Sequence, residues 1–277
     1  MVKFSHTLFA LPFALSGAAL AADRFGLAWP RVGWVLLAMV GARNAAMGFN
    51  RLADRRIDAR NPRTAQRELP SGRLSTGAVW SFTLLLTGLF ILATWQLGLL
   101  PFVVPASLIV FGYSYTKRFT WACHGVLGLA LAIAPVGGWM ALGGRFDWMI
   151  VALALAVLTW VAGFDVIYAC QDREFDRESG LHSIPARFGT ARALIISRGF
   201  HVATILAMVG VGVLGALNPL YWVGCAGIAG LLFYEHRLLK PDDLSKLGLA
   251  FFNLNGLVSV LYFVTLLVAL VVPRLLA

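Results

Sequence analysis

Hydrophobic side chains form long, nearly continuous runs along this chain, and polar side chains gather in the short stretches between the runs. One run, "WMIVALALAVLTWVAGF", holds no charged residue over residues 148–164. A helix needs roughly 20 predominantly apolar residues to cross a bilayer, whereas a membrane β-barrel would show alternating positions. The pattern therefore predicts an all-α integral membrane protein with about nine spans. These lie at 5–22, 32–50, 74–95, 99–116, 121–142, 147–169, 191–216, 219–236 and 247–272.

The first apolar run admits a second interpretation, because it ends in small residues, "LAA", as a secretory signal peptide does. It is long for such a peptide, and Lys3 is the one basic residue that precedes it. We interpret it as the first spanning helix.

Charge is scarce and unevenly placed. Only 13% of the residues are charged, against about 25% in soluble domains, and the formal net charge is +10. With the N-terminus in the cytoplasm, 19 of the 23 lysines and arginines fall on the cytoplasmic side. This bias follows the positive-inside rule, so the charge reports topology and requires no nucleic-acid partner. It favours a protein of the bacterial inner membrane.

The connections after the second and sixth spans are long and polar, and both are assigned to the cytoplasmic face. The first carries Asn50, Asp54 and Asp58 at intervals of four residues. The second polar stretch begins inside the sixth span with Asp165 and Tyr168 and continues through Asp172 and Asp176. On a continuous helix Asp172 and Asp176 would each fall within about 20° of Asp165, on opposite sides of it. Each set is expected to form a polar ridge on a helix that emerges from the membrane.

The placement of these acids is energetically unfavourable unless something else stabilises their charge. Like charges four residues apart destabilise a helix by a few tenths of a kcal/mol, and an ionised group such as Asp165 inside a span costs about 2.5–3.5 kcal/mol. If the ridges face each other, a cation must hold the carboxylates together. Oxygen ligands suit Mg²⁺, and the surrounding arginines suit a strongly anionic partner such as a diphosphate.

These stretches resemble the UbiA superfamily of intramembrane prenyltransferases over essentially the whole chain. Asn50, Asp54 and Asp58 match its first motif, N-D-x-x-D-x-x-x-D, although Arg51 stands where that motif has an acid. Asp165, Tyr168, Ala169, Asp172 and Asp176 match the second, D-x-x-Y-A-x-x-D-x-x-x-D. "RELPSG" is similar to the family's R-P-L-P-S-G, and Tyr113 with Lys117 matches Y-x-x-x-K.

The resemblance implies about nine helices around a central cavity, with the 2–3 and 6–7 connections forming a cytoplasmic cap. It implies Mg²⁺-dependent transfer of a prenyl group from a polyprenyl diphosphate to a small aromatic acceptor, with the active site facing the cytoplasm. The chain looks most like the 4-hydroxybenzoate polyprenyltransferases of quinone biosynthesis. It is also similar to relatives that act on naphthoate or futalosine-derived acceptors in menaquinone synthesis, and the choice between ubiquinone and menaquinone pathways stays open.

The resemblance also suggests roles for individual residues. Asp165 and Tyr168 would be catalytic, and Arg43 and His6 are weaker candidates for acceptor binding. The expected metal ligands are Asn50, Asp54, Asp58, Asp172 and Asp176, and the expected diphosphate ligands are Arg63, Arg67, Tyr113 and Lys117.

We expect one domain over residues 1–277, which holds two internally similar motif units at about 32–95 and 147–216. "GFNRLADRRID" and "GFDVIYACQDREFD" share a GF start and a D-R-x-x-D end. A cation-coupled transporter also places acids in broken helices and is the rival of a different class. Its acids would tend to lie at the membrane midplane, whereas most of these lie at one face.

Overall fold

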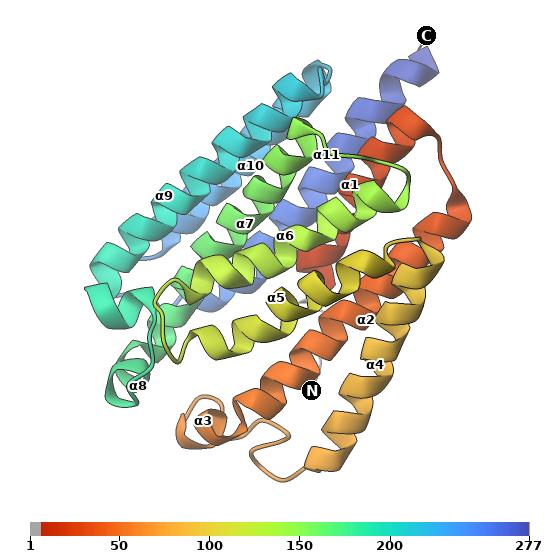
Figure 1. The fold of residues 1–277 in the computed structure, drawn as a ribbon. Helices are drawn as coiled ribbons and strands as arrows, with labels where there is room; N and C mark the ends of the chain where they lie inside the picture. The colour runs from red at the N-terminus through yellow and green to blue at the C-terminus, as the bar shows by residue number, and fades with distance from the viewer. Residues whose placement is uncertain (1–6, 277) are drawn as a thin grey trace.

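The computed structural model describes residues 7–276, and these residues form a bundle of long, nearly parallel helices (Figure 1). In chain order the elements are α1 (Thr7–Phe25), α2 (Trp29–Ala53), α3 (Arg55–Arg60), α4 (Thr76–Gln96), the 3₁₀ turn η2 (Leu100–Phe102), α5 (Val103–Thr116), α6 (Cys123–Ala141), α7 (Trp148–Ala169), the 3₁₀ turn η3 (Cys170–Asp172), α8 (Arg173–Glu178), α9 (Ile184–Leu214), α10 (Pro219–Leu238), the π-helix η4 (Leu249–Leu254) and α11 (Asn255–Leu276).

Each predicted span overlaps a helix, which confirms the all-α fold. Within the described residues, six helical segments are long and apolar enough to cross a membrane. They are Trp29–Ala53, Thr76–Gln96, Cys123–Ala141, Trp148–Glu178, Ile184–Leu214 and Leu249–Leu275. The segment Leu100–Thr116 is apolar but shorter, and α1 and α10 do not meet the same test. That these three also cross the membrane, and that the N-terminus is cytoplasmic, stay predictions.

The degree of burial follows from how apolar each helix is and where it lies. Helix α7 is apolar on all sides, packs against α6 and α9, and buries 61% of its most apolar window, including Trp160. Helix α4 is also apolar, yet only 17% of its window is buried, and Leu84 and Leu85 are exposed. Exposed apolar surface of this extent requires lipid rather than water around it.

Helices α1 and α6 cross at two glycines. A β-carbon on Gly138 would lie 2.1 Å from the carbonyl oxygen of Ala14, and one on Gly17 would lie 1.9 Å from that of Pro135. Both distances are too short for any side chain, so the two backbones approach each other only because these positions are glycine. Small residues serve this purpose widely in membrane helices.

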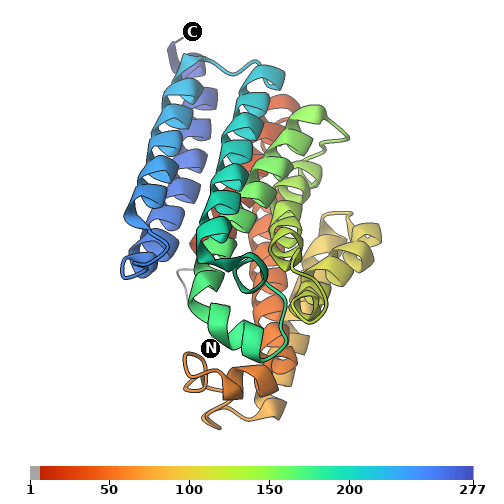
Figure 2. The ribbon, with the colours of Figure 1, turned by 90° about the vertical axis from the view of Figure 1, so that its left-hand side faces the viewer.

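The two acidic stretches lie at one end of the bundle, where α3 and α8 project beyond the long helices (Figures 1 and 2). The expectation of two continuous polar ridges was wrong. Helix α2 ends at Ala53, and α7 gives way to the turn η3, so that Asp54 and Asp172 each precede a short helix. Aspartate is a weak helix former, and paired acids repel on one helix face, which favours a break at these positions.

Candidate active site

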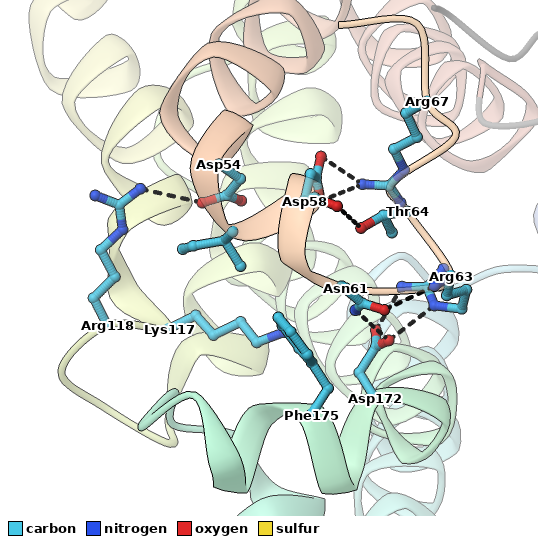
Figure 3. Close-up of a pocket in the computed structure, with 11 residues that line it drawn as sticks. Asp54, Asp58, Asn61, Arg63, Thr64, Arg67, Lys117, Arg118, Asp172 and Phe175 are labelled. Carbon is cyan, nitrogen blue, oxygen red and sulfur yellow. Dashed lines mark hydrogen bonds and ion pairs between the residues drawn. The ribbon is translucent and has the colours of Figure 1, made fainter. Parts of the chain in front are cut away.

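Charged side chains from four segments line a pocket of about 100 Å³ at this end of the bundle (Figure 3). The segments are the α2–α3 junction, the connection from residue 61 to 75, the end of α5, and η3 with α8. The lining residues are Asp54, Ile57, Asp58, Asn61, Arg63, Thr64, Arg67, Lys117, Arg118, Asp172 and Phe175. Four basic and three acidic side chains therefore face one small volume, which leaves an excess of positive charge.

Asp58 is held mainly by Arg67. The guanidinium Nη1 of Arg67 donates to both carboxylate oxygens of Asp58 at 2.9 Å, and Nη1 of Arg51 lies 3.7 Å from Oδ2. The Thr64 hydroxyl donates to the backbone carbonyl of Asp58 at 2.9 Å and ties the following connection to α3. Arg51, the base at a position where the resemblance calls for an acid, therefore adds a second positive charge beside Asp58.

Asp54 is less tightly paired. Arg118 Nη2 donates to its Oδ1 at 3.2 Å, and the Asn50 amide donates to its Oδ2 at 3.0 Å. Burial raises the pKa of the Asp54 carboxyl, and the hydrogen bond from Arg118 only partly opposes this. The carboxylate of Asp54 is thus the least well stabilised negative charge of the first motif.

Asp172 binds the connection that follows α3. Arg63 forms a two-pronged contact with it, Nε to Oδ1 at 2.9 Å and Nη2 to Oδ2 at 2.5 Å, and the Asn61 amide donates to Oδ1 at 2.9 Å. Nη1 of Arg63 also donates to the hydroxyl of Tyr168 at 2.8 Å. Burial acts to lower the pKa of Arg63, but Asp172 outweighs it and the net shift is upward. This contact joins the two motifs directly.

Asp176 lies behind the pocket and is fully buried. Lys117 Nζ approaches its Oδ1 at 2.7 Å, and the Ser183 hydroxyl donates to Oδ2 at 2.9 Å. Burial acts to lower the pKa of Lys117, but the carboxylate of Asp176 outweighs it, so the pKa is raised and the ammonium stays charged. Lys117 lines the pocket in front of Asp176 and fixes the second acid of this motif.

Each of the four motif acids outside the long helices thus has at least one basic partner in this structure, and Asp58 has two. Carboxylate oxygens are the donors that Mg²⁺ prefers, so these residues fit a magnesium site in kind. Within residues 7–276, however, no three histidine, cysteine or acidic side chains gather around one point as metal ligands. The acids instead contact arginine and lysine side chains, so a metal ion would have to replace these basic groups as the partner of the carboxylates.

Other predicted site residues lie outside the pocket lining. Asp165 pairs with His124, Nδ1 to Oδ2 at 2.7 Å, and Asn50 contacts Asp54 and the Ser114 hydroxyl. Arg43 donates to the Asn44 side chain within α2. Tyr113 lies in α5, and its backbone carbonyl accepts from Thr116. His6 lies outside the described residues.

The sequence did not identify three residues that contact the motif acids, namely Asn61, Arg118 and His124. Asn61 follows α3 in the turn "NPRT", where its side chain accepts from the Arg63 amide at 3.0 Å, and the Asn-Pro pair was a usable turn signal. Arg118 stands next to Lys117 and was considered only as part of the basic bias. His124 gave no signal in the sequence, because its partner Asp165 lies 41 residues away.

Comparisons with known proteins agree with this geometry. Residues 10–273 match the UbiA prenyltransferase family. The chain is 32% identical over 233 residues to a 4-hydroxybenzoate octaprenyltransferase of Pseudoalteromonas translucida (strain TAC 125), covering 83% of this chain and 79% of that protein. It is 31% identical over 257 residues to the enzyme of the same name from Sodalis glossinidius (strain morsitans), covering 88% and 86%.

Solved structures share the fold. A UbiA homolog from Aeropyrum pernix K1, in its apo form, superposes with a TM-score of 0.86 at 30% identity, over 97% of this chain and 99% of that one. A UbiA homolog from Archaeoglobus fulgidus bound to DMAPP and Mg²⁺ gives a TM-score of 0.72 at 20% identity, over 95% of both chains.

Proposed function

This chain belongs to the UbiA prenyltransferase family, and we propose that it transfers a polyprenyl group from a polyprenyl diphosphate to a small aromatic acceptor such as 4-hydroxybenzoate, with Mg²⁺ as cofactor. The observation that carries the proposal is the pocket at the end of the bundle, where four bases and three carboxylates converge beside a membrane-embedded helix core. Family membership argues against the transporter alternative. The names of the relatives favour 4-hydroxybenzoate over a naphthoate or futalosine-derived acceptor.

The ion pairs of the motif acids suggest how the diphosphate binds. Its oxygens offer the guanidinium groups of Arg63 and Arg67 and the ammonium of Lys117 a stronger partner than a single carboxylate. As these bases turn to the diphosphate, the carboxylates of Asp172, Asp58 and Asp176 are released. We assign those carboxylates, with Asn50 and Asp54, as the residues that would hold Mg²⁺.

Magnesium, when bound, neutralises charge on the diphosphate and makes it a better leaving group. The chain's own residues do the rest. Arg63 keeps Tyr168 in place at the pocket edge through its hydroxyl, and the Tyr168 ring stacks on Phe251 with centroids 4.1 Å apart. In the proposed reaction, this stacked aromatic pair would help to keep water away from an allylic cation. Asp165 would orient the acceptor or take up the proton that the ring carbon loses.

The experiment is a transfer assay with the purified protein in lipid vesicles. Farnesyl and longer prenyl diphosphates are each offered with 4-hydroxybenzoate or a naphthoate, and products are identified by mass spectrometry. We expect product that disappears with EDTA and returns with Mg²⁺. We also expect Asp58→Asn and Asp172→Asn to abolish transfer, while Asp242→Asn, at an exposed acid of the α10–α11 connection, retains it. Absence of product with every acceptor, or activity unaffected by EDTA, would overturn the proposal.

A further inference from the structure

A buried histidine holds Asp165, a motif acid that does not line the pocket. His124, in the first turn of α6, is 2% exposed, and its Nδ1 lies 2.7 Å from Oδ2 of Asp165. The Asp165 side chain is 24% exposed, so it is partly accessible while its Oδ2 is held by the ring. No other hydrogen-bonding partner of Asp165 is found in the described part of the chain.

The second ring nitrogen determines which proton the histidine carries. The backbone amide of Ile184 points at Nε2 of His124 at 3.2 Å. Ile184 is the first residue of α9, where an amide has no partner within its own helix and must find one elsewhere. An amide only donates, so Nε2 accepts, and the ring proton therefore sits on Nδ1 and points at Asp165.

The same helix start is bound to the second motif. Ser183, the N-cap of α9, donates its hydroxyl to Asp176, and the amide of His182 donates to the carbonyl of Lys117 at 2.7 Å. His124 therefore links Asp165 to the segment that also fixes the acid and the base at the back of the pocket. A histidine that merely filled space between helices would not need both nitrogens engaged in this way.

We propose that His124 is a positioning residue for the transfer reaction: locked with its proton on Nδ1 by the Ile184 amide, it holds the Asp165 carboxylate in one orientation and leaves its second oxygen for the acceptor or its proton. The inference rests on the proposed function, in which Asp165 meets the acceptor. Arg63 and Arg67 would bind the diphosphate from the connection after α3, whereas His124 is tied to the start of α9, so loss of the His124 side chain should act on turnover rather than on diphosphate binding.

Two substitutions of similar size separate the two ring nitrogens. The side-chain amide of asparagine reaches the place of Nδ1, so His124→Asn can still donate to Asp165. Glutamine reaches the place of Nε2, so His124→Gln can accept from Ile184 but leaves Asp165 without its donor. We expect kcat to fall about 10–100-fold in His124→Gln, the range for removing an orienting partner, and to stay within about threefold of wild type in His124→Asn.

The KM for the prenyl diphosphate should be unchanged in both variants, and both should unfold at similar temperatures because each loses one hydrogen bond. His182→Ala, which removes an exposed histidine side chain nearby, is the matched control and should have wild-type kinetics. Equal losses of kcat in the asparagine and glutamine variants, or a wild-type kcat in His124→Gln, would overturn the assignment.

A spectroscopic measurement tests the same contact without relying on activity. In protein with ¹⁵N-labelled histidine, the His124 signals are identified by their loss in His124→Asn. We expect a neutral ring protonated on Nδ1, with a shifted Nδ1 resonance in Asp165→Asn. A ring protonated on Nε2 alone would overturn the inference even in a fully active enzyme. Conversely, a wild-type protein that transfers no prenyl group but shows the Nδ1 proton would overturn only the proposed function.

Discussion

The Arg63–Asp172 pair predicts an unequal response when either partner is removed. The Arg63 side chain is 30% exposed, whereas that of Asp172 is 8% exposed. Opposite charges about 4 Å apart attract by about 4 kcal/mol at an effective dielectric constant near 20, and the loss of hydration offsets much of this. In Asp172→Ala the guanidinium still reaches water and Tyr168. In Arg63→Ala the buried carboxylate keeps, within residues 7–276, the hydrogen bond from the Asn61 amide and the more distant charge of Lys117.

We therefore expect Arg63→Ala to lower the free energy of unfolding by about 2–4 kcal/mol, because it leaves a buried charge unpaired. Asp172→Ala should cost only about 1 kcal/mol, since its partner can be hydrated. The double variant should be more stable than Arg63→Ala alone, with a coupling energy of about 1–3 kcal/mol.

The measurement is denaturant unfolding of the four proteins in one detergent, followed by tryptophan fluorescence. Arg177→Ala removes half of an exposed pair with Glu174 on α8 and should change the unfolding curve little, which makes it the control. Equal losses in the two single variants, or additive losses in the double variant, would refute the reasoning.

Three further predictions concern stability. Because burial raises the pKa of Asp54 above 3.8, its charge destabilises the fold above the folded-state pKa and has no effect well below 3.8. Asp54→Asn should therefore raise the melting temperature at about pH 7 more than at about pH 3, and an equal gain at both would contradict this. Gly138→Ala places a β-carbon against the backbone of α1 and should lower the free energy of unfolding, measured with denaturant, by about 1–3 kcal/mol. Gly137→Ala, whose β-carbon would meet open space, should change it little. Equal effects would rule out close packing of α1 against α6. Asn255→Ala leaves the buried carboxyl of Glu235 and the indole of Trp160 without the side-chain amide that both contact. We expect it to lower the free energy of unfolding by about 3–5 kcal/mol, whereas Asn253→Ala, at an exposed side chain, should change it very little. Similar melting curves for the two variants would count against this network.

The helical elements could be predicted from the sequence because one physical rule dominates a bilayer. Apolar runs of sufficient length must be helical there, and each predicted range overlaps a helix. The breaks at Asp54 and at Cys170–Asp172 could not be placed in the same way. The positions of these breaks depend on where each aspartate finds a basic partner. Arg118 becomes a neighbour of Asp54, and Arg63 a neighbour of Asp172, only through the tertiary fold.

The site could be predicted by residue type but not by pairing. Spacing brought Asp54, Asp58, Asp172 and Asp176 together as candidates, and the structure brings the first three to one pocket. The spacing of the acids in the sequence did not show that Asp165 pairs with a histidine instead. Residue spacing indicates which face of a helix an acid lies on. Its hydrogen-bonding partner depends on which neighbouring helix has a donor side chain at the same level along the bundle.

The two motifs are alike in their local structure. Asp54 and Asp172 have nearly the same backbone angles, φ −93° and ψ 5° against φ −99° and ψ 6°, and each precedes a helix of six residues. Each helix carries a second acid four residues later and an apolar residue that faces the pocket, Ile57 or Phe175. The repeat in sequence is thus also a repeat in conformation.

The basic partners are distributed crosswise between these two motifs. The connection after α3 supplies one arginine to each motif, and the residues that follow α5 likewise supply one base to each. The pairs are Arg67 with Asp58, Arg63 with Asp172, Arg118 with Asp54 and Lys117 with Asp176. Each motif therefore draws its basic partners from both segments. A diphosphate that draws bases from both segments would therefore act on the two motifs together, as the proposed site, with acids more than a hundred residues apart, requires.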